Sequence, residues 1–223
     1  MKYHIDYDLE LRENPYKGKY IAVEGVDASG KTTQIDHIVE YFKKKQEAVI
    51  TVSEPSDKGV TGDLIRKILA GTEKIPLVAF QYIFSADRTI QFENEIIPAL
   101  KSGINVVSGR CFWSALPYGI MDRGVTEYKD DDMDLLMMAQ GILSMYHQFI
   151  VPDHTFYLKI SAETAMDRLS VMDKQKEIYE RKSKLIRLVK GYEWVARKFP
   201  EAITVIDGEQ SIDNVTRDII KLL

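Results

Sequence analysis

The loop Gly25-Val26-Asp27-Ala28-Ser29-Gly30-Lys31-Thr32 constrains the fold of this chain more than any other feature. It fits the pattern G-x-x-x-x-G-K-[ST], it follows an apolar run, and it opens a segment with helical spacing of apolar residues. In such a loop the glycines let the backbone wrap around a polyphosphate, and the first N–H groups of the helix stabilise negative charge. A tight turn alone would explain the glycines but not Lys31-Thr32. The sequence therefore predicts a nucleoside triphosphate site, with Lys31 on the β- and γ-phosphates and the Thr32 hydroxyl on Mg²⁺.

The rest of the chain alternates between two kinds of segment. Five short apolar runs rich in β-forming residues cover 20–26, 48–54, 104–109, 154–160 and 202–208. Segments with helical spacing cover 32–45, 60–70, 76–101, 130–149, 161–172, 176–199 and 211–223. This alternation predicts an α/β fold with a doubly wound, five-stranded parallel sheet flanked by helices. Residues 1–18 are polar and unpatterned, so we expect an N-terminal extension before one domain over 19–223.

Composition narrows the environment and the partners. The 223 residues contain 30 Lys and Arg against 34 Asp and Glu, a net charge of −4, which gives no support to nucleic acid as a partner. The lone cysteine, Cys111, fits a reducing compartment. No run approaches the roughly 18 apolar residues of a membrane span. We therefore expect a cytoplasmic protein with no membrane partner.

Three local features have competing interpretations. The run Asp130-Asp131-Asp132 could be a metal site, but the apolar periodicity directly after it favours a helix start capped by carboxylates. Met133, Met137, Met138 and Met145 indicate packed core or a subunit interface rather than a cofactor site. His147 and His154 have no metal-ligand spacing.

Arginines suggest a second phosphate site. A phosphate loop does not by itself separate kinases from GTPases, ATPases or motors. The chain has no N-K-x-D guanine motif and no strand that ends in D-x-x-G. Arg66, Arg88 and Arg110 instead recur at the ends of predicted elements, and arginine suits bidentate contacts with phosphate.

From about residue 19 to its end, the chain resembles the thymidylate kinase family of P-loop nucleoside monophosphate kinases, which phosphorylate dTMP from ATP. The resemblance rests on YIAVEGVDASGKTTQ, SEP with LIRKIL, FSADRTIQ, GRCFWSALPYG, PDHTFYLKI, AMDRL, GYEWVA and VIDG, in order. It implies the P-loop kinase fold with a small lid near 169–182, Mg²⁺ and ATP as cofactor and donor, and a homodimer.

The resemblance also implies roles for individual residues. Lys31, Asp27 and Arg110 are expected at the transferring phosphoryl group, and Arg168 near the adenine. Phe84 is expected to stack on the acceptor base; without the resemblance, a core aromatic explains it equally well. ATP binding is assigned to Gly25, Ser29, Gly30, Lys31, Thr32, Thr33 and Arg168. Acceptor binding is assigned to Glu54, Arg66, Phe84, Arg88, Arg110, Ser114 and Tyr118, and metal binding to Thr32.

The chain departs from the family pattern at several of these motifs. Gly109 stands where the family has an aspartate that orders Mg²⁺, so we expect Asp27, Glu54 or Asp153 to compensate, or a slow enzyme. Ser53 replaces an arginine. Ala115 and Gly119 replace polar groups near the base. Ala28 and Met172 stand where subclasses carry a P-loop or lid arginine, which leaves Lys174, Lys176 and Arg181 as basic candidates.

The sequence as a whole favours Mg²⁺-dependent transfer of the ATP γ-phosphoryl group to a deoxynucleoside 5′-monophosphate, most simply dTMP. Catalysis in such enzymes is mainly positioning and charge stabilisation. Two alternatives stay open. One is a kinase for another small acceptor, such as dUMP or a nucleoside, and the other is a nucleotide-binding protein with little turnover.

Overall fold

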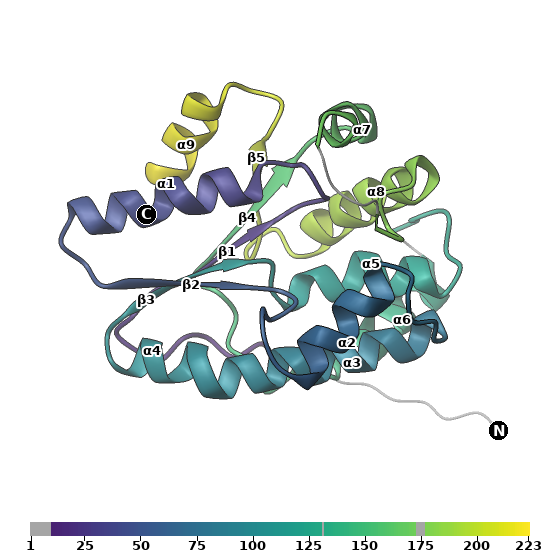
Figure 1. The fold of residues 1–223 in the computed structure, drawn as a ribbon, viewed down its shortest axis with the longest axis horizontal. Helices are drawn as coiled ribbons and strands as arrows, with labels where there is room; N and C mark the ends of the chain where they lie inside the picture. Colours follow the sequence, from purple (N-terminus) through teal and green to yellow (C-terminus); the bar gives the residue numbers. More distant parts are fainter. Residues whose placement is uncertain (1–9, 131, 173–176) are drawn as a thin grey trace.

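The structure, a computed structural model, describes residues 10–130, 132–172 and 177–223. Its centre is a sheet of five parallel strands in the order β2-β3-β1-β4-β5 (Figure 1). The strands are β1 (Tyr20–Glu24), β2 (Val49–Ser53), β3 (Asn105–Gly109), β4 (His154–Lys159) and β5 (Thr204–Asp207). Each lies inside one of the five predicted runs, so the predicted sheet is confirmed.

Helices cover both faces of the sheet (Figure 1). On one face, α1 (Lys31–Lys44) and α9 (Ile212–Ile220) cover side chains that include Ile21 and Val23. The alternate residues Tyr20 and Ala22 belong to the larger core on the other face. The remaining helices are α2 (Val60–Leu69), α3 (Leu77–Gln91), α4 (Ile97–Lys101), α5 (Ala115–Asp122), α6 (Met133–Leu143), α7 (Ala162–Ser170) and α8 (Lys182–Lys198). Because β1 is buried on both faces, its apolar run does not alternate.

Three helical predictions need correction. The single helix predicted over 76–101 is instead two α-helices, α3 and α4, joined by a π-helical turn at Phe92–Ile96. The helix predicted over 130–149 ends at Leu143, and the one predicted over 176–199 begins at Lys182. The sequence did not predict α5 or the 3₁₀ turn Phe112–Ser114 before it. This stretch is almost wholly buried, so it has no polar face to show a helical period. It also contains Pro117 and Gly119, which usually disfavour helices.

The acidic run before α6 starts that helix, as predicted. Asp132 is its N-cap, and its Oδ1 accepts hydrogen bonds from the backbone N–H of Asp134 at 3.0 Å and of Leu135 at 3.2 Å. Asp131 lies outside the described residues. Among the part of the chain that the structure describes, no three His, Cys, Asp or Glu residues gather as a metal-binding group.

The described part of the N-terminal extension packs against the domain at the amino ends of the strands. Arg12 pairs with Ile150 in an isolated parallel bridge. Asn14 Nδ2 donates to Asp153 Oδ2 at 2.8 Å, and the same oxygen accepts from the Tyr20 N–H at 2.7 Å. Asp153 therefore lies at the amino ends of the strands, whereas the phosphate loop lies at their carboxyl ends. The expectation that Asp153 compensates for Gly109 is wrong.

Candidate active site

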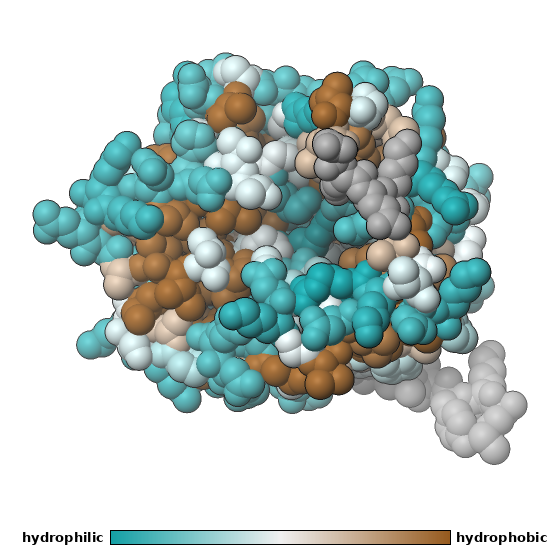
Figure 2. All heavy atoms as spheres, viewed as in Figure 1, coloured by the Kyte–Doolittle hydropathy of each residue, from teal (hydrophilic) through white to brown (hydrophobic). Residues whose placement is uncertain are grey.

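The site lies at the carboxyl ends of β1, β2 and β3. The strand order reverses direction between β1 and β3, and such a switch point leaves a crevice for a ligand in open α/β sheets. Figure 2, drawn in the view of Figure 1, shows a hollow near the middle of the molecule, with hydrophilic residues at its base. Two cavities meet there.

The larger cavity, about 830 Å³, follows the phosphate loop. It is lined by the predicted residues Ser29, Gly30, Lys31, Thr32, Thr33 and Arg168, and by Gly208 and Gln210 after β5. Gly25 lies beneath the loop at φ 142°, where an added Cβ would come within 2.9 Å of the Leu158 carbonyl oxygen. Only glycine fits there, so this residue shapes the loop rather than lining the cavity.

Two basic side chains of this cavity hold loop carbonyls. Lys31 Nζ donates to the carbonyl oxygens of Gly25 at 3.1 Å and Val26 at 2.9 Å. Arg168 donates to the Ala28 carbonyl at 3.2 Å and, across the cavity, to the Gly208 carbonyl at 3.0 Å. A bound polyphosphate would offer both cations charged oxygens in place of neutral carbonyls.

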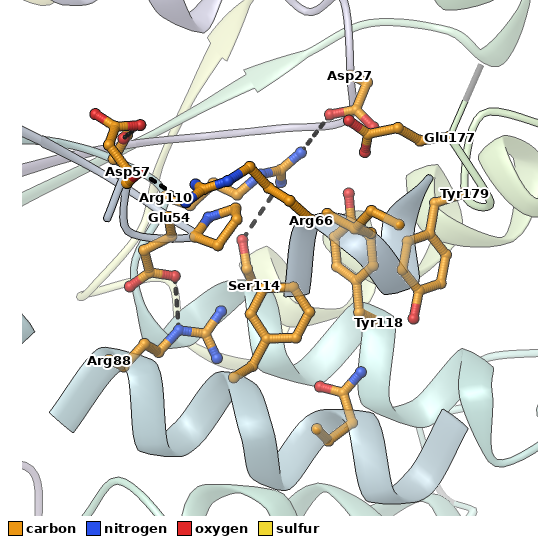
Figure 3. A pocket seen from close by; sticks show the side chains of 15 residues that line it. Asp27, Glu54, Asp57, Arg66, Arg88, Arg110, Ser114, Tyr118, Glu177 and Tyr179 are labelled. Atoms are coloured by element: carbon orange, nitrogen blue, oxygen red, sulfur yellow. Dashed lines mark hydrogen bonds and ion pairs between the residues drawn. The ribbon is translucent and has the colours of Figure 1, made fainter. Parts of the chain in front are cut away.

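The smaller cavity, about 340 Å³, contains every residue predicted for the acceptor (Figure 3). Glu54 follows β2, Arg66 comes from α2, Phe84 and Arg88 from α3, and Arg110 follows β3. Ser114 and Tyr118 line it from the unpredicted 3₁₀ turn and α5. Asp57, Gln81, Glu177 and Tyr179 line it as well, and sequence reasoning missed them.

Arg88 and Glu54 form a buried ion pair at the inner wall of this cavity. Arg88 Nε donates to Glu54 Oε2 at 2.6 Å, and the two side chains are 5% and 6% exposed. Burial alone would lower the pKa of Arg88, but the charge of Glu54 and the Tyr146 hydroxyl raise it above its ordinary value. The arginine is therefore charged, and it lies 5.5 Å from the centre of the half-buried Phe84 ring. An aromatic face beside a fixed cation suits a planar base that carries a carbonyl group.

Arg66 binds the loop that follows β2. It donates to the carbonyl oxygens of Ser56 at 2.5 Å and Asp57 at 2.6 Å, and it contacts the Asp63 carboxylate at 3.0 Å. The Arg66 side chain is 40% exposed, unlike that of Arg88. It can therefore exchange loop carbonyls for a phosphate.

Arg110 stands where the two cavities meet. Its Nη2 donates to Asp27 Oδ1 at 2.6 Å, and its Nη1 donates to the Tyr192 hydroxyl and the Gly25 carbonyl, each at 2.9 Å. Burial acts to lower its pKa, but nearby Tyr118, Tyr192 and Asp27 raise it well above the ordinary value. Both Asp27 and Arg110 line both cavities, so one ion pair spans the route between them (Figure 3).

The structure explains several departures from the family pattern. A Cβ on Gly109 would meet Ile35 Cδ1 at 3.2 Å, so an apolar side chain from α1 takes the neighbouring space. A Cβ on Gly119 would meet Ile142 Cδ1 at 2.9 Å, because this residue faces α6 rather than the acceptor cavity. Neither Ala115 nor Gly119 lines that cavity, so the expectation that these two positions lie near the base is wrong. Ser53 Oγ donates to Asp57 Oδ1 at 3.3 Å.

The lid is only partly described. Val171 and Met172 line the larger cavity, directly after α7. Lys174 and Lys176 lie outside the described residues. Arg181 precedes α8, is exposed, and lines neither cavity. That one of these three residues supplies the positive charge of the lid stays a prediction.

A buried carboxylate behind Arg110 also escaped the sequence analysis. Glu24, the last residue of β1, is 1% exposed and accepts hydrogen bonds from Ser114 and Tyr192. The available signal was a carboxylate that ends an otherwise apolar strand directly before the phosphate loop. Tyr192 carried no such signal, because its position on α8 looks like that of any core aromatic.

A phosphate loop and a separate, arginine-lined cavity joined by one ion pair define a P-loop kinase of a small acceptor. The family model described as thymidylate kinase matches residues 23–219. The chain belongs to the thymidylate kinase family.

Individual relatives agree over nearly the whole chain. A thymidylate kinase of Thermoanaerobacter sp. (strain X514) is 31% identical over 212 residues, which are 93% of this chain and 98% of that protein. A probable thymidylate kinase of Thermococcus gammatolerans is also 31% identical, over 92% of this chain and 96% of its own. A thymidylate kinase of Nitrosospira multiformis is 27% identical, with the same coverage of 92% and 96%. Separately, no helix in the described ranges is long and apolar enough to cross a membrane.

Proposed function

We propose that this protein transfers the γ-phosphoryl group of ATP to dTMP and releases dTDP and ADP. The observation that carries the proposal is the Asp27–Arg110 ion pair, which lines both the phosphate-loop cavity and the arginine-lined cavity. A donor in one cavity and a monophosphate in the other would meet at this pair. The names of the relatives make dTMP the acceptor to test first.

The donor occupies the larger cavity in this proposal. Its phosphates lie along Gly30–Thr33, where the start of α1 offers backbone N–H groups, and Lys31 leaves its loop carbonyls for the β- and γ-phosphates. Arg168 and the turn at Gly208 flank the adenine. Val171 and Met172, which line this end, belong to the lid predicted over 169–182.

The acceptor occupies the smaller cavity. Its base stacks on Phe84 and directs a carbonyl group toward Arg88, and Tyr118 lies beside the sugar. Arg66 and Arg110 then hold the monophosphate, and Glu54 keeps Arg88 in place. The monophosphate is thereby directed at the junction, which removes most of the translational and rotational freedom of the reacting groups.

Phosphoryl transfer needs charge stabilisation more than covalent help from the protein. Lys31 and Arg110 supply fixed positive charge where the equatorial oxygens of the moving group develop negative charge. Thr32 is exposed at the start of α1, and its hydroxyl would hold Mg²⁺ as an oxygen ligand. When bound, the ion neutralises charge on the β- and γ-phosphates.

The proposal includes a homodimer formed through α3. The exposed residues of this helix are all apolar or aromatic, and they are Val78, Ala79, Tyr82, Ala86 and Ile90. Its charged residues, Asp87 and Arg88, are buried instead. The apolar outer side of α3 is exposed to solvent, and packing against the same helix of a second copy would bury it. We also place the protein in the cytoplasm, where ATP is available and the thiol of Cys111 stays reduced.

The test is ADP release measured with ATP and a panel of acceptors: dTMP, dUMP, dCMP, dAMP and thymidine. We expect the highest kcat/KM with dTMP. A preference for dUMP would assign a different nucleotide acceptor. Turnover of thymidine would contradict the role of Arg66 and Arg110 as phosphate ligands. Tight ATP binding without turnover of any acceptor would instead show a nucleotide-binding protein.

A further inference from the structure

We infer that Glu24 is a positioning residue that fixes the guanidinium of Arg110 through two hydroxyl groups. The inference rests on the proposed function, because it concerns the arginine assigned there to the acceptor phosphate. Glu24 itself touches neither cavity. It acts from behind the site.

The two oxygens of this carboxylate bind different groups. Oε1 accepts from the backbone N–H of Cys111 at 2.9 Å and of Ser114 at 3.2 Å. Oε2 accepts from Ser114 Oγ at 2.6 Å and from the Tyr192 hydroxyl at 3.0 Å. These four groups all donate to the carboxylate. Cys111 Sγ also lies 3.4 Å from Oε1. A 1%-exposed carboxylate whose partners lie on the turn that carries Arg110 and on α8 suggests a functional rather than a packing role.

Neither the Ser114 hydroxyl nor the Tyr192 hydroxyl can donate to Arg110. An arginine can only donate hydrogen bonds, and an ionised carboxylate can only accept them. Arg110 Nη1 contacts Tyr192 Oη at 2.9 Å and Ser114 Oγ at 3.5 Å, and these two oxygens lie 2.8 Å apart. Ser114 must therefore donate to Glu24, and Tyr192 must donate to Glu24 or to Ser114. Either way, both hydroxyl oxygens turn their lone pairs toward Arg110.

The same carboxylate also holds the backbone turn that carries the arginine. Arg110 has φ 80°, a left-handed conformation that is unfavourable for a residue with a side chain. Its N–H donates to the Val23 carbonyl at 3.0 Å, so β1 binds this turn on one side. The bonds from Cys111 and Ser114 to Glu24 bind it on the other. Glu24 thus fixes both the backbone and the guanidinium of Arg110.

The isosteric variant Glu24→Gln tests this direction of donation. The two backbone N–H groups require an acceptor, so they hold the amide oxygen at the position of Oε1. The amide nitrogen then replaces Oε2 and donates to the hydroxyls, which turns a hydroxyl proton toward the N–H groups of Arg110. We expect kcat/KM for dTMP to fall by about 10- to 100-fold, with the KM for ATP changed by less than about twofold.

A double-mutant cycle with Arg110→Ala separates positioning from general stability. If Glu24 acts through Arg110, Glu24→Gln causes no further loss of kcat/KM for dTMP in the Arg110→Ala protein. An equal loss in both backgrounds would overturn the inference. So would a Glu24→Gln enzyme with the parental kcat/KM. A parent protein that turns over none of the monophosphates would contradict the proposed function instead.

A second variant covers the case in which Glu24→Gln does not fold. Tyr192→Phe removes one hydroxyl of the pair and keeps the ring, and Tyr157→Phe is the matched control because its ring stacks on Tyr192 at 5.2 Å. We expect only Tyr192→Phe to lower kcat/KM for dTMP, and to do so less in the Arg110→Ala background. Equal effects of the two tyrosine variants would count against the inference.

Discussion

Arg110 shows how a single residue connects the two halves of the site. Its guanidinium reaches Asp27 in the phosphate loop and Tyr192 on α8, although these residues are far apart in the sequence. Its backbone adopts a left-handed conformation, which costs about 1–3 kcal/mol in residues other than glycine. Contacts to β1 on both sides of the turn offset this cost. The sequence indicated a phosphate-binding arginine here, but it could not show that the residue is strained.

Replacement of Lys31 tests the phosphate loop. In Lys31→Ala the cation that follows the transferring phosphoryl group is lost, so we expect kcat to fall by about 100-fold or more, the scale of a single preorganised electrostatic group. The Tm without nucleotide should change little, because the contacts of this side chain with the Gly25 and Val26 carbonyls and the Asp27 carboxylate lie within the phosphate loop. Steady-state kinetics and a thermal melt measure both. If Lys31→Ala kept the turnover of the parent protein, the proposed role of the phosphate loop in catalysis would be wrong.

Gly109 allows a sharper test of how this chain departs from its family. A carboxylate at this position would lie against Ile35, since an added Cβ already meets Ile35 Cδ1 at 3.2 Å. Gly109→Asp alone should therefore lower Tm and kcat, because an apolar neighbour cannot satisfy the new charge. The double variant Gly109→Asp with Ile35→Ser should recover part of both losses.

Mg²⁺ titrations of the three proteins decide between steric and electrostatic causes. If Ile35 is the obstacle, the single variant needs more Mg²⁺ for half-maximal activity than the double variant. A clear gain of activity in Gly109→Asp alone would show that the native chain lacks a carboxylate that it could use.

At the scale of elements, the strands were easier to predict than the helices. A buried parallel strand is a short apolar run, and each of the five runs contained one. The 3₁₀ turn and α5 were missed, because burial of almost every residue between Phe112 and Met121 removes the polar face on which helical periodicity depends. This missed segment carries Ser114 and Tyr118, so the sequence assigned these two residues to the acceptor cavity without predicting the elements that hold them there.

The cap of α6 is a prediction that belongs to this scale. Asp132 satisfies two N–H groups at the start of the helix, so Asp132→Ala should lower the free energy of unfolding by about 1 kcal/mol. Asp134→Ala is the control, since this carboxylate lies in the first turn and its charge interacts with the helix dipole. Urea denaturation should show the larger loss for Asp132→Ala. Changed kinetics in Asp132→Ala would revive the interpretation of the acidic run as a functional site.

At the scale of the whole molecule, the sheet, the site and the assembly depend on one another. The acceptor cavity uses the inner side of α3, which carries Phe84 and Arg88, and the apolar outer side of the same helix includes Tyr82 and Ile90. The order of segments predicted the sheet, and the motifs predicted residues that line both cavities. The contacts of Glu24 and Tyr192 depend on tertiary packing, which has no local pattern in the sequence.

The outer side of α3 gives the last prediction, which concerns assembly. Tyr82 is 60% exposed on this helix, and a charge there would have to be desolvated in any dimer that covers the face. Tyr82→Glu should therefore sediment as a monomer at concentrations where the parent protein is a dimer. Val205→Glu is the matched control, because Val205 is 49% exposed on β5, at the far edge of the sheet. Its sedimentation should equal that of the parent. Since α3 also carries Phe84 and Arg88, loss of the partner should raise the KM for dTMP more than the KM for ATP. A parent protein that sediments as a monomer, or a Tyr82→Glu protein that remains a dimer, would exclude α3 as the interface.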